Sequence, residues 1–408
     1  MKTGDQVTCL LGNREVDATY ITERDGMAVI KLNSGYNIGV SPGCLEYMGE
    51  GIQKPVPEIP VFQDDSLPDL AIISTGGTIA SRVDYRTGAV TSQSTAEEII
   101  RAIPRLATLG CYRTRQPFSI LSENMEPSMW VELARTIYEE IEAGVKGVIV
   151  THGTDTMAYS ASAVSFMLDT PVPVIFVGSQ RSADRPSSDN AMNMLCSARA
   201  ATADLGEVVI CMHGTANDDY CSLHRATRVR KMHTSRRDAF QSIGTRPIGS
   251  VTYPDLSVTI TPDAIGRSSQ EPALYDTLEE KCALIPYYPG MDSLILEHYA
   301  SYRGIVIAGT GLGHVGSAFL DGIRQCISQG TTVVMTSQCL HGRVCNRVYD
   351  TGRDLLRSGV VEGEDMLPET ALVKLMWVLG QTDDPLEIRK MMQQSVKGEI
   401  QRRSLYGL

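Results

Sequence analysis

The strongest constraint on the fold is a repeated alternation of short apolar runs with amphipathic stretches, which begins at Asp69. In the stretch 128–141, Leu133, Ile137 and Ile141 recur at helical spacing. Strands that alternate with helices in this way favour a largely parallel sheet with helices on both faces. The predicted strands of this first unit are 70–74, 147–150, 172–177 and 207–212, and Ser94 with Glu97 predicts a helix through Ile103.

A second unit of the same kind follows a polar stretch, 256–280, which contains Pro262 and Pro272 and is typical of a crossover between domains. Its predicted strands are 283–287, 304–308 and 332–336, and its predicted helices are 291–299, 317–328 and two segments after Pro368 and Pro385. We therefore predict two α/β domains with mainly parallel sheets, at residues 69–255 and 281–408.

The first fifty residues have a different pattern. Strand-like runs at 7–11, 18–22, 27–32 and 36–40 are separated by turn residues, among them Asp25-Gly26, a strong hairpin signal. This pattern predicts a small β-barrel-like domain over residues 1–52. Four prolines within 53–68 indicate an extended linker to the first α/β domain.

Composition narrows the class of protein. The chain has 408 residues, and its formal charge of −11 disfavours strong unaided binding to nucleic acid or to anionic membranes. Ten cysteines without a C-x-x-C pair indicate reduced, mostly buried thiols of a cytosolic protein. No apolar segment follows Met1, and the uncharged stretch 156–168 is too short to span a bilayer. We expect a cytoplasmic protein without a membrane partner.

Two threonine- and glycine-rich loops follow predicted strands, where ligands bind in open α/β sheets. They are Thr75-Gly76-Gly77-Thr78 and Thr151-His152-Gly153-Thr154-Asp155-Thr156. Glycines let the backbone approach a ligand, and successive N–H groups can form an oxyanion hole. A threonine nucleophile needs a base, and Asp155 lies beside Thr154. Taken alone, either loop is better explained as a turn that ends a strand and caps a helix.

Together, the two loops resemble the two signatures of the bacterial-type asparaginase/glutaminase family. Tyr85 resembles the lid tyrosine of that family, Ser122-Glu123-Asn124-Met125 the segment that holds the substrate α-carboxylate, and Lys231 the catalytic lysine. The resemblance covers roughly residues 69–390 and implies an asparaginase-like fold and a side-chain amidohydrolase that forms an acyl-threonine.

The resemblance also implies a role for each matching residue. Thr78 and Tyr85 would form one nucleophile pair, while Thr154, Asp155 and Lys231 would form a second group that relays a proton. We favour Thr78 as the nucleophile, but both threonines stay open. Secreted asparaginases usually carry Gln where this chain has Glu123, which leaves the preferred amide open. The substrate-binding residues that the resemblance implies are Gly77, Ser122, Glu123, Gly153 and His314.

Within that family, the chain most resembles the ammonia-producing subunits of archaeal tRNA-dependent amidotransferases. The shared features are the extra N-terminal domain, the run 224–238 and the segment 364–371. The resemblance implies a partner subunit that binds ATP and Mg²⁺, contacts the tRNA and uses the ammonia to convert Glu-tRNA(Gln) to Gln-tRNA(Gln). It implies no cofactor in this chain, and a homodimer through the asparaginase-like domains. The alternatives are a free-standing cytosolic L-asparaginase and a non-catalytic binding module.

Several motifs keep a second interpretation. Six basic residues in 225–237 could form a docking face around Lys231 or a solvated, salt-bridged loop. Gly311-Leu312-Gly313-His314-Val315-Gly316 matches a dinucleotide motif, but no acidic residue ends the next strand. Cysteines and histidines at 211–224 and 339–345 lack the spacing of structural zinc ligands. Trp130 and Trp377 are predicted core residues.

Overall fold

The computed structural model describes residues 1–33, 36–50, 64–76, 81–83, 90–92, 100–182 and 187–404, with the backbone alone at 81–83 and 90–92. Those two backbone segments, β7 (Ser81–Val83) and β8 (Val90–Ser92), pair antiparallel. Gly77, Thr78, Tyr85, most of the linker 53–68 and most of the helix predicted from Ser94 lie outside these residues.

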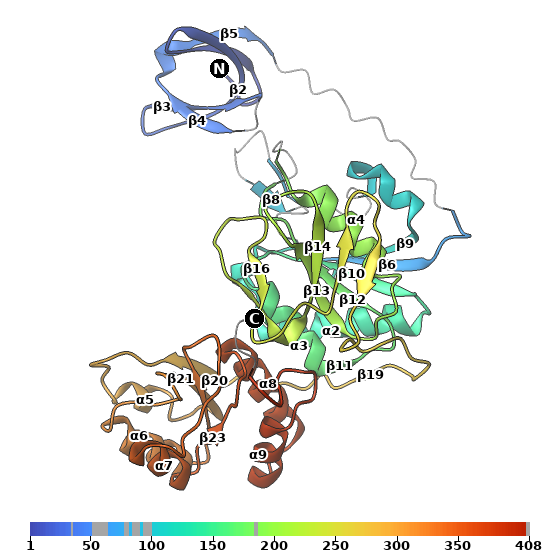
Figure 1. The fold of residues 1–408 in the computed structure, drawn as a ribbon. Coiled ribbons are helices and arrows are strands. Elements are labelled where there is room, and N and C mark those ends of the chain that lie inside the picture. Colours follow the sequence, from blue (N-terminus) through green and yellow to red (C-terminus); the bar gives the residue numbers. More distant parts are fainter. Residues whose placement is uncertain are drawn as a thin grey trace.

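The N-terminal domain is an antiparallel sheet in the order β4-β3-β2-β1-β5, drawn in blue in Figure 1. Its strands are β1 (Gln6–Leu11), β2 (Arg14–Arg24), β3 (Met27–Leu32), β4 (Asn37–Val40) and β5 (Leu45–Gly49). Asp25 and Gly26, at φ 54° and 75°, form the predicted hairpin turn. The sequence pattern missed β5, whose Tyr47 and Met48 are exposed. Among the ladders of residues 1–33 and 36–50, none joins β4 to β5 to close a barrel.

The central sheet has eight strands in the order β18-β17-β14-β13-β12-β10-β6-β9. β6 (Asp69–Ser74), β9 (Cys111–Arg115), β10 (Gly147–Thr151), β12 (Val174–Val177) and β13 (Val208–His213) run parallel. β14 (Tyr220–Arg225), β17 (Gly249–Thr252) and β18 (Val258–Ile260) then pair antiparallel. The sheet is therefore mixed, because a short hairpin loop can join only antiparallel neighbours. It continues to Ile260, beyond the boundary predicted at 255.

Helices cover both faces of this sheet, as the alternation predicted. α2 (Pro127–Glu142) and α3 (Met157–Met167) pack against one face, which Ala71, Ile73, Val148 and Val150 supply. α4 (Asn190–Ala200) packs against the other, which Leu70, Ile72, Ile149 and Ile175 supply. Successive strand residues thus enter opposite cores, which is why these strands read as continuous apolar runs.

The C-terminal domain has a parallel sheet in the order β20-β21-β22-β23. The strands are β20 (Cys282–Pro286), β21 (Gly304–Gly309), β22 (Thr332–Ser337) and β23 (Val361–Glu362). The helices are α5 (Ile295–His298), α6 (Phe319–Ser328), α7 (Asp350–Arg357), α8 (Pro368–Gln381) and α9 (Pro385–Gln393). α5 is much shorter than the predicted helix 291–299, because Tyr288–Leu294 forms turns in which Asp292 Oδ1 accepts from Leu294 N.

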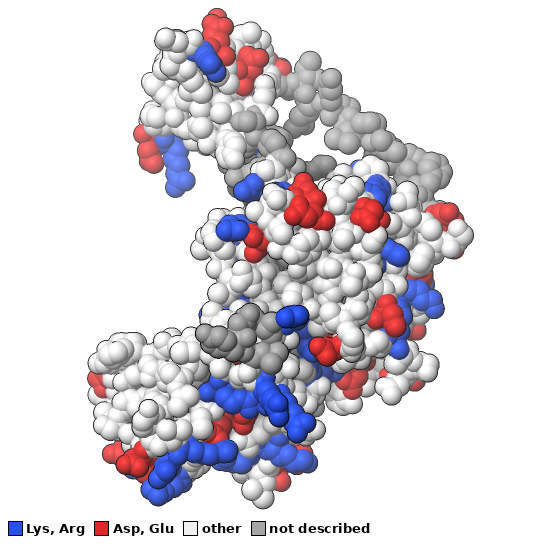
Figure 2. All heavy atoms as spheres, viewed as in Figure 1, with Lys and Arg blue, Asp and Glu red and all other residues white. Residues whose placement is uncertain are grey.

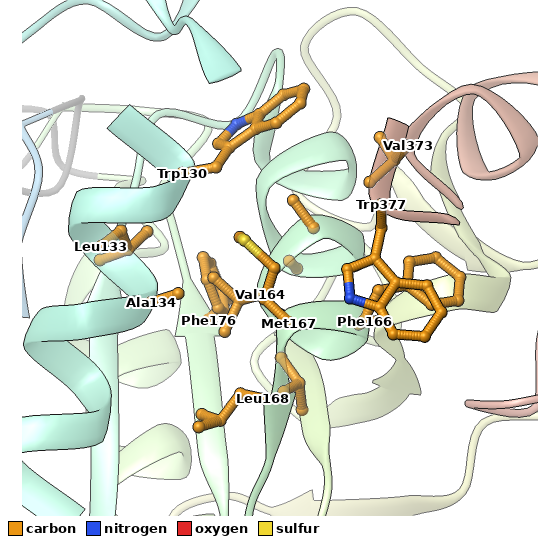
Figure 3. Close-up of a cluster of buried hydrophobic side chains, with 14 of the residues drawn as sticks. Trp130, Leu133, Ala134, Val164, Phe166, Met167, Leu168, Phe176, Val373 and Trp377 are labelled. Atoms are coloured by element: carbon orange, nitrogen blue, oxygen red, sulfur yellow. The ribbon is translucent and has the colours of Figure 1, made fainter. Parts of the chain in front are cut away.

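α8 joins the two α/β domains through one shared apolar core. Phe166 on α3 stacks on Trp377 of α8 with ring centroids 5.9 Å apart, while Trp130 lies in the same core on α2 (Figure 3). Both tryptophans are buried, as predicted. Apolar side chains of β21 and β22, Val306 and Val334, complete this core from the C-terminal sheet. The joint is therefore a continuous hydrophobic interior.

Charge and cysteine chemistry complete the description. On the face shown in Figure 2, Lys and Arg side chains gather over the C-terminal domain, in the lower part of the view. All ten cysteines are free and six are buried, in line with the prediction of mostly buried thiols. Across the part of the chain that the structure describes, no helix combines the length and apolarity needed to cross a membrane.

Candidate functional site

Three segments meet at the carboxyl ends of β6 and β10, which are neighbours in the sheet. Thr75 donates to the carbonyl oxygen of Thr151 from both its backbone N (3.1 Å) and its Oγ1 (3.0 Å). Gly76 forms a parallel bridge with Ile120, whose N donates to Thr75 O at 3.1 Å. The two signature loops therefore begin side by side, and the segment before Ser122 lies next to the first of them. Gly77, Thr78 and Tyr85 follow in the chain but lie outside the described residues.

Thr154, Asp155 and Lys231 form one hydrogen-bonded group. Lys231 Nζ donates to Thr154 Oγ1 at 2.9 Å and to Asp155 Oδ1 at 2.8 Å. Thr154 is 7% exposed, whereas the side chain of Asp155 is 69% exposed. The arrangement places a buried hydroxyl, an amine and an accessible carboxylate within reach of one another, as proton transfer to or from the hydroxyl requires.

Lys231 lies on a two-stranded ribbon that is far from the second signature loop in sequence but adjacent to it in space. It is the last residue of β15 (Val229–Lys231) and pairs with Phe240 of β16 (Phe240–Ser242). Phe240 and Val229 are buried in the same core as α3. This packing fixes the base of the ribbon, so that the lysine side chain reaches Thr154 across 77 residues of sequence.

Glycine at position 153 is dictated by Ser122. A Cβ added to Gly153 would lie 2.6 Å from Ser122 Cβ and 2.8 Å from Ser122 Oγ, closer than real Cβ contacts. Ser122 opens the 3-10 helix η4 (Ser122–Asn124), and its carbonyl oxygen accepts a bond of 2.7 Å from Thr156 Oγ1. Ser122 is buried, and Glu123 beside it is exposed. The structure thus brings Ser122 against the second signature loop.

His152 and Gly178 also shape the site, and sequence reasoning assigned neither a role. His152 Nδ1 lies 2.7 Å from Gly153 O and must donate to it, because a carbonyl only accepts. Burial lowers the pKa of His152 to about 4, so the ring is neutral. A Cβ on Gly178 would lie 2.6 Å from Thr154 Cγ2 and 2.8 Å from His152 O. Gly178 directly follows β12, and that strand-end position was the available signal.

His314 lies apart from this group. Its backbone forms an antiparallel bridge with Thr310 in the loop after β21. Its ring packs edge-on against that of Tyr349, with the ring centroids 5.4 Å apart. These contacts lie within the C-terminal domain, and the structure of this single chain does not bring His314 to Thr154, Asp155 or Lys231. Among the residues with described side chains, no group of three or more His, Cys, Asp or Glu is placed to hold a metal ion.

The basic run is not one exposed face. Arg225 pairs with Glu207 at 2.7 Å, and Arg228 pairs with Asp365 at 3.2 Å with side chains only 1% and 3% exposed. Arg230 pairs with Glu369, Arg236 with Asp238 and Arg237 with Asp218. A docking face is therefore wrong for Arg225 and Arg228, which are buried. The alternative of a salt-bridged loop fits the five arginines of the run, each of which has an acidic partner, although Arg225 and Arg228 are buried and not solvated.

Both α/β domains match known family models. Residues 69–263 match the family "Asparaginase, N-terminal" and residues 281–392 match the "Glutaminase/Asparaginase C-terminal domain". The thermostable L-asparaginase from Thermococcus kodakarensis has the same fold, with a TM-score of 0.74 and 31% identity over 82% of this chain and all of that one. A probable cytoplasmic L-asparaginase from Campylobacter jejuni gives a TM-score of 0.68 at 26% identity, over 80% of this chain and all of that one.

Relatives of nearly the same length include the N-terminal domain in the match. The D subunit of the Methanosarcina mazei glutamyl-tRNA(Gln) amidotransferase is 51% identical over 98% of both chains. The corresponding D subunit of Archaeoglobus fulgidus is 56% identical over 93% of this chain and 91% of its own length. The chain therefore belongs to the family of glutamyl-tRNA(Gln) amidotransferase D subunits, whose α/β domains are those of an asparaginase-like amidohydrolase.

Proposed function

We propose that this chain produces ammonia from the side-chain amide of glutamine or asparagine for the amidation of Glu-tRNA(Gln). The observation that carries the proposal is Lys231 Nζ, which lies within 2.9 Å of Thr154 Oγ1 and 2.8 Å of Asp155 Oδ1. Such a group can transfer protons to and from a reacting hydroxyl or leaving amine. The amidotransferase relatives at 51–56% identity support ammonia transfer as its purpose.

The chemistry proceeds by acyl transfer in two halves. A threonine hydroxyl attacks the amide carbon, the C–N bond breaks, and the nitrogen leaves as ammonia after it receives a proton. Water then attacks the acyl-threonine ester, which releases the free acid and restores the hydroxyl. We assign the attack to Thr78 with Tyr85, and the proton transfers to Thr154, Asp155 and Lys231. Backbone N–H groups at Gly77 and Gly153 would stabilise the oxyanion.

Substrate recognition is assigned to the segment beside Gly153. Ser122 would hold the α-carboxylate, while Asp155 and Glu123, both exposed carboxylates, would attract the α-ammonium group. His314 would approach the substrate from a neighbouring copy in a homodimer. We place ATP, Mg²⁺ and most of the tRNA contact on the partner subunit, with no cofactor in this chain and the complex in the cytoplasm.

The nucleophile can be identified by trapping. Chains carrying Thr78→Val or Thr154→Val, incubated with glutamine and analysed by mass spectrometry, should differ in whether they retain an acyl adduct. We expect no adduct on Thr78→Val and a trapped adduct on Thr154→Val, because loss of the second threonine impairs the later proton transfers. An adduct retained by Thr78→Val would instead identify Thr154 as the nucleophile.

The function itself is tested by measuring ammonia release from glutamine and asparagine. The purified chain is assayed alone, and then with the partner subunit, ATP and Glu-tRNA(Gln). We expect slow release by the chain alone and faster release when all components are present. Fast release that does not change when the partner subunit, ATP and Glu-tRNA(Gln) are added would indicate a free-standing L-asparaginase. This is the second candidate function, because the fold matches the Thermococcus kodakarensis L-asparaginase along that enzyme's full length.

A further inference from the structure

The ribbon that carries Lys231 ends in a loop, residues 232–239, that is closed mainly on itself. Met232 N donates to Ala239 O at 2.6 Å, and His233 Nδ1 accepts from both Ser235 N and Arg236 N at 3.0 Å. Arg236 pairs with Asp238 two residues away. These bonds give the loop its shape, but they do not fix its position relative to the rest of the domain.

Arg237 supplies the tether. Its Nη1 donates to Asp218 Oδ1 at 2.5 Å, and its Nη2 donates to the carbonyl oxygen of Ala216. Its side chain is 15% exposed, against 56% for Arg236 beside it. Within residues 232–239, all of which the structure describes, the side-chain hydrogen bonds that leave the loop all come from Arg237.

Ala216 and Asp218, which hold Arg237, are connected to the Thr154 site through buried side chains. Ala216 and Asp218 lie in the short connection between β13 and β14, and His213 ends β13 at the base of that connection. His213 is fully buried, and its Nδ1 lies 2.6 Å from Asn193 Oδ1. Since Asn193 Nδ2 donates to Gly178 O (2.9 Å) and Asp189 (3.0 Å), its Oδ1 is the acceptor and His213 Nδ1 donates.

Gly178 is the wall behind Thr154, because a Cβ at position 178 would lie only 2.6 Å from Thr154 Cγ2. A chain of contacts therefore leads from the Lys231 ribbon to Thr154. It runs through Arg237, the 214–219 connection, His213, Asn193 and Gly178. His213 Nε2 also lies 3.4 Å from Asp218 Oδ1, so the same carboxylate that accepts from Arg237 lies beside the buried histidine. The 214–219 connection is thus held between Arg237 on one side and His213 on the other.

We propose that Arg237 is a positioning residue for Lys231: it fastens the 232–239 loop to the same buried framework that holds the wall behind Thr154. This inference rests on the proposed function for its catalytic consequence. A base displaced by about 1 Å can cost as much as about 100-fold in rate. Loss of the tether should therefore slow proton transfer, while Ser122 and Glu123, which do not contact Lys231, keep their assigned hold on the substrate.

The neighbouring arginine provides a matched control. Arg237→Gln and Arg236→Gln make the same change of charge one residue apart, but only the first breaks a bond that leaves the loop. We expect Arg237→Gln to lower kcat for ammonia release about 10-fold or more with KM changed less than about twofold. Arg236→Gln should leave both constants within about twofold, and Arg237→Lys, which can still reach Asp218, should restore part of kcat.

Hydrogen exchange of residues 229–242 separates the tether from the chemistry. It is measured on the full-length wild type and both glutamine variants, in the presence of the partner subunit. We expect faster exchange in Arg237→Gln alone, whether or not the chain hydrolyses amides. Equal exchange and equal kcat in the two variants would overturn the tether. Faster exchange in Arg237→Gln together with no ammonia release by the wild type would instead overturn the proposed function and leave the tether standing.

Discussion

At the scale of single residues, the contact between Gly153 and Ser122 offers a direct test of substrate binding. A methyl group at position 153 would have to displace Ser122, whose Cβ and Oγ lie 2.6 and 2.8 Å from the added carbon. We expect Gly153→Ala to raise KM for the amide about 10-fold or more, because a displaced Ser122 would hold the α-carboxylate less well. A tenfold change in affinity corresponds to about 1.4 kcal/mol of lost binding. Steady-state kinetics of ammonia release measure it.

The control for this substitution is Gly43→Ala in the N-terminal domain. The nearest atom to a Cβ at Gly43 is Ser41 Oγ at 4.0 Å, so the added methyl makes only an ordinary van der Waals contact. KM should be unchanged there. If Gly153→Ala also leaves KM unchanged while the protein stays folded, Ser122 does not hold the substrate.

Residue chemistry was more predictable than residue contacts. Thr154, Asp155 and Lys231 could be selected from the sequence, and the structure brings all three together. Gly178 and Arg237 could not be assigned these roles, because each acts through a neighbour that only the tertiary fold brings close. His152 bonds the adjacent Gly153, but the burial that lowers its pKa also comes from the tertiary fold. His314 stays a prediction, since a site completed by a second chain is not visible in one.

At the scale of elements, two buried histidines make the central sheet sensitive to acid. His152 follows β10 and His224 lies in β14, and burial lowers the pKa of each from 6.5 to about 4. Both are neutral in the folded protein, whereas the unfolded chain takes up protons below its pKa of about 6.5. Their contribution to stability is therefore present above pH 6.5 and is lost as the pH falls toward 4.

We expect the free energy of unfolding to fall by about 2 kcal/mol per histidine between pH 7 and pH 5, from about 1.4 kcal/mol per pKa unit. Urea unfolding at both pH values measures it. His224→Gln should remove about half of what His152 and His224 together contribute to this pH dependence. Removing the exposed His341, as His341→Gln, should leave it intact. Identical slopes for the two variants would show that His224 is not held neutral by the fold.

Most strands that are buried on both faces were predictable, although β14, with five of its six residues buried, was not predicted. The runs at 70–74, 147–150 and 304–308 were found because nearly every residue in them enters a core. Strands β17 and β18 were missed because they lie toward the edge of the sheet, where Ser250, Thr252, Val258 and Thr259 are not fully buried. α5 was overestimated because its apolar spacing continues through turns that Asp292 stabilises.

At the scale of the whole molecule, the two α/β domains are joined by a buried ionic network that no sequence pattern revealed. Arg228 of the first domain donates to the carbonyl oxygens of Asp365 (2.8 Å) and Glu399 (3.0 Å). Lys374 on α8 and Glu399 form an ion pair of 2.5 Å in which both side chains are 0% exposed. Charged residues this far inside persist only when paired, and their partners are distant in sequence.

Breaking this pair should destabilise the protein far more than breaking an ion pair at the surface. Burial lowers the pKa of Lys374, and the Glu399 carboxylate offsets this by stabilising the ammonium ion. In Glu399→Gln the ammonium keeps two carbonyl acceptors, Met392 O and Gln394 O, but loses its countercharge. We expect a loss of about 3 to 5 kcal/mol in the free energy of unfolding, measured by urea denaturation at pH 7.

The surface comparison is Glu387→Gln, which breaks the pair of Lys390 with Glu387, whose side chains are 66% and 43% exposed. That change should cost less than about 1 kcal/mol, because exposed pairs are screened by water and salt. The double variant Lys374→Met with Glu399→Leu should regain much of the loss, since it removes both buried charges and fills the space with apolar side chains. Similar losses for Glu399→Gln and Glu387→Gln would mean that water reaches Lys374, and that its charge does not depend on Glu399 as a buried partner.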